Sequence, residues 1–220
     1  MSFFLLCFIL FLPLIPTFAQ DNRSAIWNFN TGRNLESQNL MREAEIYYHE
    51  SIRIATDEIA RNNATRDSYT ALTWSLRRLE RHADVIMWGE RGLMFFTDEY
   101  RIVETMGESY FYLNDFDESL RYMQRYVNAV PQGGRASVAY FFKGEIYRFR
   151  RNFHHADIAY STAVRLYPGQ ALWWFRLATV REAAGDFENA VLAYEEVLRL
   201  NPNHQAASSG LARSLLANGR

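Results

Sequence analysis

The sequence predicts an all-α fold in which pairs of short helices repeat along the chain as an α-solenoid. Three observations predict it: a pattern of 34 residues recurs, large apolar residues follow a helical period within each copy, and no stretch alternates like a strand. The chain has 220 residues, of which 49% are hydrophobic. That length and composition suffice for one elongated domain without disulfide bridges.

The two clearest copies of the pattern occupy residues 137–170 and 171–204. The later copy carries large, small and proline residues at fixed positions, namely Trp174, Leu177, Ala178, Ala190, Tyr194 and Pro202. The earlier copy fills the corresponding positions with Tyr140, Lys143, Gly144, Ala156, Tyr160 and Pro168. At 3.6 residues per turn this spacing gives each half an apolar stripe, so each copy should fold as two facing helices.

This period and pattern resemble those of the tetratricopeptide repeat family. The resemblance implies helix-turn-helix units stacked into a superhelix, which usually binds peptides or other proteins and carries no enzymatic chemistry. One unit cannot bury its own apolar stripe, so the units should stabilise one another by stacking in a line.

The same register predicts about five units and a C-terminal capping helix within a domain that spans residues 20–220. The expected units are 25–58, 66–99, 100–133, 137–170 and 171–204, and the expected cap helix is 205–220. In the first unit, Gly32 belongs to the first helix and Ala44 and Tyr48 to the second, with an insertion around Arg61 after it.

The second and third units follow the pattern less closely. The second keeps Tyr69 and Leu72 in its first helix. The third keeps Met106 and Gly107, and extra residues from Gly134 to Ala136 separate it from the next unit.

Within a unit, small residues and helix breakers should set the geometry. Gly144 and Ala178 should let the partner helix approach closely, because their side chains add little bulk. Asn152 and Gly185 tolerate the geometry of a turn. Pro168 lacks the backbone donor that a continuing helix needs, so it should end its unit.

The C-terminal helix should act as a cap, because the last unit of a solenoid needs a cover with a polar outer face. Three leucines are expected to face the last unit, namely Leu211, Leu215 and Leu216. The polar outer face is expected to consist of Ser208, Ser214 and Asn218.

Residues 1–19 form an apolar leader. The unbroken run from Phe3 to Leu12 is followed by two prolines and by small residues at positions 17 and 19. This pattern is typical of a secretory signal peptide, here cleaved after Ala19. Because Met1 and Ser2 supply no Lys or Arg, an uncleaved anchor in a membrane is the alternative. An exported repeat protein whose mature chain lacks cysteine fits a bacterial periplasm best.

Composition argues against several functional classes. The formal net charge is -1, so no overall basic field attracts nucleic acid or anionic lipid. The single cysteine lies in the leader, which rules out a thiolate metal site in the rest of the chain. His154 and His155 are adjacent, and neighbouring helical residues point in different directions, so one ion would not bind both. Without a phosphate loop or a nucleophile motif, we expect no enzyme, no metal and no cofactor.

The family resemblance places a peptide-binding groove on the first helix of each unit. Carrying that register over, the groove should be lined by Phe29, Arg33, Thr70, Trp74, Arg77, Arg78, Glu104, Glu108, Phe111, Tyr112, Phe141, Glu145, Arg148, Phe149, Phe175, Thr179 and Glu182. Aromatic residues between charges of both signs suit a peptide groove, because flat apolar area gives affinity and charge gives specificity. First-helix aromatics also pack against the next unit, so a share of these residues is expected in the core.

The order of charges along the groove leads to a more specific prediction. Arg77 and Arg78 precede Glu104 and Glu108 by one unit, so the wall should change sign within one step. Some family members hold a C-terminal carboxylate with Lys and Asn on these helices. The two glutamates here would repel a carboxylate, so that mode of binding is not expected.

Two functions remain open. The first is a non-enzymatic interaction module that binds a peptide or protein segment in the concave groove. The alternative is an assembly subunit that docks on a bacterial envelope complex, in outer-membrane biogenesis or transport, or on a second copy of the same chain.

Overall fold

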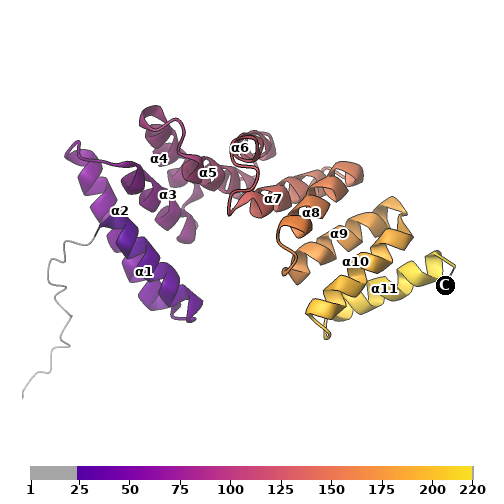
Figure 1. Ribbon diagram of the computed structural model, residues 1–220. Coiled ribbons are helices and arrows are strands. Elements are labelled where there is room, and N and C mark those ends of the chain that lie inside the picture. The colour runs from indigo at the N-terminus through magenta and orange to yellow at the C-terminus, as the bar shows by residue number, and fades with distance from the viewer. Residues whose placement is uncertain (1–23, 220) are drawn as a thin grey trace, which may run out of the picture.

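The computed structural model describes residues 24–219, and the predicted leader 1–19 lies outside them. The described residues form helices and short turns, in the order α1 (Ala25–Ser37), α2 (Met41–Ala60), α3 (Arg66–Arg78), α4 (His82–Phe95), α5 (Tyr100–Tyr112), α6 (Phe116–Ala129), α7 (Ala136–Phe149), α8 (Phe153–Leu166), α9 (Ala171–Ala184), α10 (Phe187–Leu200) and α11 (Gln205–Ala217). Consecutive helices pair along the chain and α11 follows the last pair (Figure 1). The all-α class and the solenoid of helix pairs are confirmed.

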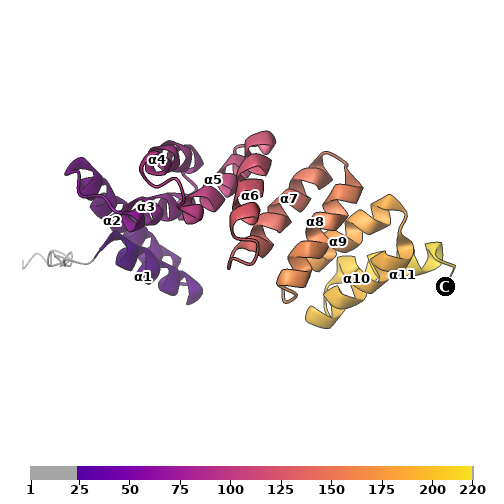
Figure 2. The ribbon, with the colours of Figure 1, turned by 45° about the horizontal axis from the view of Figure 1, so that its top comes forward.

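The helix pairs follow one another in a curved row, with α1 and α11 at opposite ends (Figures 1 and 2). First helices of successive pairs contact each other. Helix α1 contacts α3, α3 contacts α5, α5 contacts α7, and α9 contacts α11. Within residues 24–219, no two second helices contact each other as extensively as these first helices do. The first helices therefore form the inner wall of the curve and the second helices form its outer wall.

Close approach within a pair depends on residues without side-chain bulk. A Cβ added to Gly144 on α7 would lie 2.6 Å from the ring of Tyr160 on α8. One added to Gly32 on α1 would lie 2.7 Å from the ring of Tyr48 on α2. The expectation that small residues let the partner helix approach is confirmed at these positions.

The turn between the two helices of a pair uses a left-handed residue at the same place in every unit. Asn39, Glu80, Asn114, Arg151 and Gly185 have φ values of 63°, 56°, 61°, 56° and 79°. Asparagine and glycine adopt this conformation at low cost, whereas Glu80 and Arg151 give no sequence signal for it. The turn of the fourth unit therefore centres one residue earlier than predicted.

Side-chain caps begin most of the second helices from the third unit onward. The carboxylate of Asp115 accepts from the backbone N–H of Glu118 at 3.2 Å. Asn152 plays the same part at the start of α8, where it accepts from the N–H of His155 at 3.3 Å. Such caps satisfy donors that have no partner inside the helix. Asn152 is thus a cap rather than the turn residue itself.

Helix lengths differ from the expected units in two places. Helix α2 continues to Ala60, two residues beyond the expected end of the first unit, and a short turn over residues 61–65 follows it. Helix α3 then starts at a capping box between Thr65 and Ser68. Helix α7 begins at Ala136, one residue before the expected start. Within residues 24–219, no helix is long and apolar enough to cross a bilayer.

Buried residues form two clusters that meet at α7. The first extends from α1 to Ala136, Ala139 and Phe142 of α7. The second extends from α8 to α11, and Phe141 and Tyr147 of α7 pack against it. Helices α7 and α9 lack the extensive contact that joins the other first helices. Helix α7 therefore belongs to both cores.

The cap helix α11 meets the last unit through a face that was predicted only in part. Leu211 packs against the second cluster, as expected. Its buried residues are Ala207, Gly210 and Ser214, whereas the side chain of Leu216 is 78% exposed. A Cβ at Gly210 would lie 2.3 Å from the ring of Tyr194. The buried ring of Tyr194 fills the space beside α11, so only small residues fit there. The assignment of Leu216 to the inner face and of Ser214 to the outer face was wrong.

Candidate functional site

The inner wall contains one hollow of about 120 Å³ that several elements build together. Its lining comes from α1, α3, α5 and α6 and from the residue before α7, namely Phe29, Arg33, Trp74, Arg77, Arg78, Arg101, Glu104, Tyr126 and Arg135. Five arginines and three aromatic residues meet there. Such a hollow can offer flat apolar area together with hydrogen-bond donors for acidic groups.

Stacking of first helices places the aromatic floor of the hollow. Phe29 on α1 and Trp74 on α3 lie with ring centroids 4.9 Å apart. The guanidinium of Arg33 lies 5.9 Å from the Phe29 ring, and that of Arg101 lies 5.8 Å from the Trp74 ring. These contacts hold both cations against the aromatic floor.

Six of the expected groove residues line this hollow, namely Phe29, Arg33, Trp74, Arg77, Arg78 and Glu104. Thr70 is fully buried and does not face it.

The two glutamates of the third unit do not form an exposed acidic patch. Glu104 and Glu108 are each 3% exposed. Arg135 donates to Glu104 at 2.8 Å and also to Glu108, and Arg77 pairs with Glu108 at 3.0 Å. The expected change of sign along the wall was wrong, because arginines cover these carboxylates. The same contacts remove the reason to expect repulsion of a carboxylate.

Burial changes the pKa of one carboxyl group in this cluster. Burial and the neighbouring carboxylate of Glu108 raise the pKa of Glu104 to about 8, against the opposing effect of Arg135. Glu104 therefore binds a proton more readily than an ordinary glutamate does.

Two other expected groove residues, Glu145 and Glu182, accept hydrogen bonds from buried tyrosines. The hydroxyl of Tyr160 donates to Glu145, which also pairs with Arg148 at 2.8 Å. The hydroxyl of Tyr194 donates to Glu182 at 2.5 Å. Glu36 accepts from Tyr48 in the same way at the other end of the chain. These glutamates join the two helices of a unit and do not line the hollow.

The remaining expected residues lie along α5, α7 and α9, away from the hollow. Phe111 packs against Phe142, and Phe149 stacks on Phe116 with centroids 5.6 Å apart. Phe141 stacks on Trp173 at 5.3 Å. The others in this group are Tyr112, which stacks on His82, Phe175, which contacts His204, and half-buried Thr179.

Three residues of the hollow were missed from the sequence. Arg101 occupies the second position of α5, Tyr126 belongs to a second helix, and Arg135 lies among the extra residues before α7. The family register predicts groove residues only on the exposed face of first helices. The inserted residues around Arg135 were the one available signal, since an insertion breaks the register at the inner wall.

Family models agree with the repeats seen in the fold. Tetratricopeptide repeat models match residues 105–133, 137–170 and 175–220. The chain is a tetratricopeptide-repeat protein. No curated protein sequence matches it.

Solved structures resemble this tetratricopeptide-repeat protein over most of its length. MamA from Desulfovibrio magneticus RS-1 is 16% identical with a TM-score of 0.60, over 82% of this chain and 97% of that one. A MamA double mutant is 16% identical with a TM-score of 0.64, over 81% and 97%. A tetratricopeptide repeat protein from Parabacteroides merdae is 14% identical with a TM-score of 0.58, over 89% and 73%. At these identities the likeness shows the fold alone.

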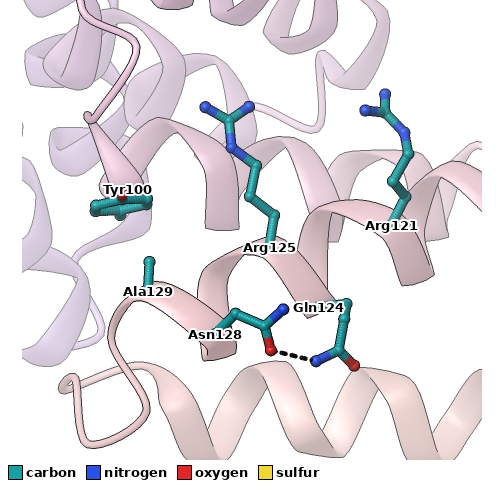
Figure 3. A pocket seen from close by; sticks show the side chains of 6 residues that line it. All are labelled: Tyr100, Arg121, Gln124, Arg125, Asn128 and Ala129. Atoms are coloured by element: carbon teal, nitrogen blue, oxygen red, sulfur yellow. Dashed lines mark hydrogen bonds between the residues drawn. The ribbon is translucent and has the colours of Figure 1, made fainter.

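A second hollow of this tetratricopeptide-repeat protein is larger, about 600 Å³, but lies on the outer wall over α6 and the start of α5 (Figure 3). Gln124 donates to Asn128 at 2.6 Å, and Arg125 donates to the carbonyl of Thr97 at 2.6 Å. Among the described residues, those of α6 and Tyr100 alone line this hollow, whereas α1, α3, α5 and α6 converge on the inner one. The inner hollow is therefore the better candidate for a binding site.

Proposed function

We propose that this chain is a non-enzymatic binding module that holds a segment of another protein against its inner wall. The observation that carries the proposal is the hollow between α1, α3 and α5, where aromatic rings and arginines from separate units converge. The tetratricopeptide-repeat fold is typically an interaction module, and a rigid concave wall needs little rearrangement to receive a partner.

Position-specific photocrosslinking tests the proposal. A photoreactive amino acid placed at Arg33, which is exposed on the inner wall, should crosslink a partner protein in cells. The same amino acid at Ile158, which is 52% exposed on the outer helix α8, is the matched control. We expect an adduct from position 33 that is absent from position 158.

Two results would contradict this proposal. Equal crosslinking from both positions would show that the inner wall has no preference for the partner. Adducts formed only with a second copy of the chain, or with a large envelope complex through position 158, would favour the assembly role instead.

We further propose that the chain is exported and that residues 1–19 are removed. The apolar leader and the small residues before Gln20 support this. A tagged chain expressed in a Gram-negative bacterium should appear in the periplasmic fraction with Gln20 as its first residue. Ala19→Arg should block cleavage and leave the chain in the membrane fraction. Retention of the leader in the unchanged chain would overturn cleavage and favour an anchor.

A further inference from the structure

The inner hollow receives positive charge from four separate elements. The arginines come from α1, α3, α5 and the residue before α7, namely Arg33, Arg77, Arg78, Arg101 and Arg135. Glu104 is the one carboxyl among the described residues that line it. The hollow is therefore cationic at its surface although the whole chain has a formal net charge of -1.

In two of the ion pairs at the hollow, the arginine is more exposed than the carboxylate. The side chain of Glu108 is 3% exposed and that of its partner Arg77 is 18% exposed. The side chain of Glu104 is 4% exposed and that of Arg135 is 44% exposed. At these two pairs a ligand would therefore meet the arginine more readily than its counter-charge.

Two arginines have unused capacity for an acceptor. Within residues 24–219, Arg33 has no carboxylate partner, and its guanidinium lies 5.9 Å from the ring of Phe29. Arg78 binds Glu36 through one Nη atom at 3.0 Å. Burial and the positive charge of Arg77 lower the pKa of Arg78. An acceptor oxygen beside Arg78 would offset the repulsion between the two guanidinium groups.

The aromatic floor limits what can bind. A guanidinium over a ring can bind a planar carboxylate along its N–H edge, as Arg101, 5.8 Å from the Trp74 ring, already binds Glu99. The hollow of about 120 Å³ is too small for an α-helix, which is about 10 Å across. It accepts individual side chains of an extended segment.

We propose that the hollow binds an extended acidic peptide segment, with side-chain carboxylates on Arg33 and Arg78 and a flanking apolar side chain against Trp74. This inference rests on the proposed function and names the chemistry of the partner. The carboxylates are those of Asp or Glu side chains within the segment, so the segment needs no free C-terminus.

Nucleic acid also carries negative charge, but the arrangement favours a peptide. Phosphate backbones bind long basic tracks, and their affinity grows with the number of phosphates neutralised. Here five arginines line one small hollow and form no long track, and the formal net charge of the chain is -1. A single-stranded oligonucleotide is therefore included as a competing probe.

Selection from a display library of random peptides tests the inference with the full chain. The peptides are fused at both ends, so that no free C-terminus is available. We expect Asp, Glu and aromatic residues to be enriched in the selected peptides. Replacing each acidic residue by its amide in the best peptide should weaken binding at least about tenfold, and added salt should weaken the acidic form more than the amide form.

Arg33→Glu and Arg91→Glu form a matched pair for the protein side. Both arginines are exposed, lack a carboxylate partner within residues 24–219 and lie over an aromatic ring, but Arg91 is on the outer helix α4. Arg33→Glu should weaken binding at least about tenfold, and Arg91→Glu should leave it unchanged. Arg33→Lys, which keeps the charge but loses the planar fork, should give an intermediate loss.

Enrichment of neutral or basic peptides, no enrichment at all, equal loss for Arg33→Glu and Arg91→Glu, or tighter binding of the oligonucleotide would each overturn the inference. Its failure can be told from failure of the proposed function. A partner crosslinked from position 33 through a segment without acidic residues would preserve inner-wall binding and reject only the acidic segment.

Discussion

The hydroxyl of Tyr194 donates a hydrogen bond of 2.5 Å to the carboxylate of Glu182, which joins the two helices of the last unit. Arg213 from the cap helix binds the same carboxylate at 2.7 Å. Burial and this hydrogen bond raise the pKa of Tyr194, while Arg213 lowers the pKa of Glu182. The Glu182 carboxylate thus connects α9, α10 and α11. The cap helix is held to the solenoid by this ion pair as well as by packing.

Tyr194→Phe should lower the free energy of unfolding by about 1.5–3 kcal/mol, because it removes a buried hydrogen bond to a charged group. Tyr167→Phe is the matched control, since Tyr167 is 51% exposed and its hydroxyl has no hydrogen-bond partner within residues 24–219. Chemical denaturation of both variants provides the measurement. Equal stability of the two would show that the Glu182 bond contributes nothing.

Gly144→Ala should destabilise the fold by about 1–3 kcal/mol through overpacking. The added methyl group would lie 2.6 Å from the ring of Tyr160, which is fully buried and cannot move aside. Gly134→Ala has no atom within 4 Å of the added carbon and should leave stability unchanged or slightly raised. Thermal melts compare the two. A melting temperature for Gly144→Ala at or above that of Gly134→Ala would contradict the close approach of α7 and α8.

Arg151→Gly should raise the free energy of unfolding by up to about 1 kcal/mol. Arg151 has a φ of 56°, a left-handed conformation that glycine adopts without steric cost. The same substitution at Arg165, an exposed residue inside α8, should lower stability by about 1 kcal/mol. Opposite signs in denaturant titrations are the expected outcome. A loss at both positions would mean that the turn at Arg151 carries no strain.

The prediction for Glu104 concerns pH. Its pKa rises from an ordinary 4.5 to about 8 in the folded chain, so folding takes up a proton between these values and stability falls as pH rises through this window. Glu104→Gln should therefore flatten the decline in melting temperature between about pH 5 and pH 9. Glu195→Gln, at an exposed position without an ion partner within residues 24–219, should keep the slope of the unchanged chain. If Glu104→Gln leaves the decline in melting temperature with pH unchanged, a group other than Glu104 takes up the proton on folding.

Removal of residues 205–220 should lower the melting temperature and cause aggregation. The loss of α11 uncovers the ring of Tyr194 and frees Glu182 from Arg213. Ending the chain after Leu215 instead removes mainly exposed residues and keeps both contacts, so that chain should stay soluble. Size-exclusion chromatography with thermal melts separates the two. Similar behaviour of both shortened chains would show that α11 is not a cap.

The sequence was sufficient to predict the helix pairs, because spacing within each copy reports which residues share a helix face. It did not predict which inner-wall residues stay exposed. Glu104 and Thr70 lie on the expected face, yet both are buried where first helices of successive units pack together. The helical period shows which residues share a face of a helix. It does not show whether that face contacts solvent or the neighbouring unit.

The hollow was only partly predictable for a related reason. Arg135 reaches Glu104 across 31 positions of the sequence and from outside the repeat register. Tyr126 reaches the inner wall from a second helix. Pairings that depend on how one unit rotates on the next leave no trace in the pattern of a single unit. The turn at Arg151 was mislocated because its left-handed residue is neither Gly nor Asn.

Helix α7 supplies side chains to both cores, and its contact with α9 is weaker than those between the other first helices. The row of first helices is therefore joined most weakly between α7 and α9, where α8 supplies the main connection. A partner seated in the hollow contacts residues up to Arg135 and does not span this weak junction. A partner long enough to reach α9 as well would bridge the junction and fix the angle between the two cores.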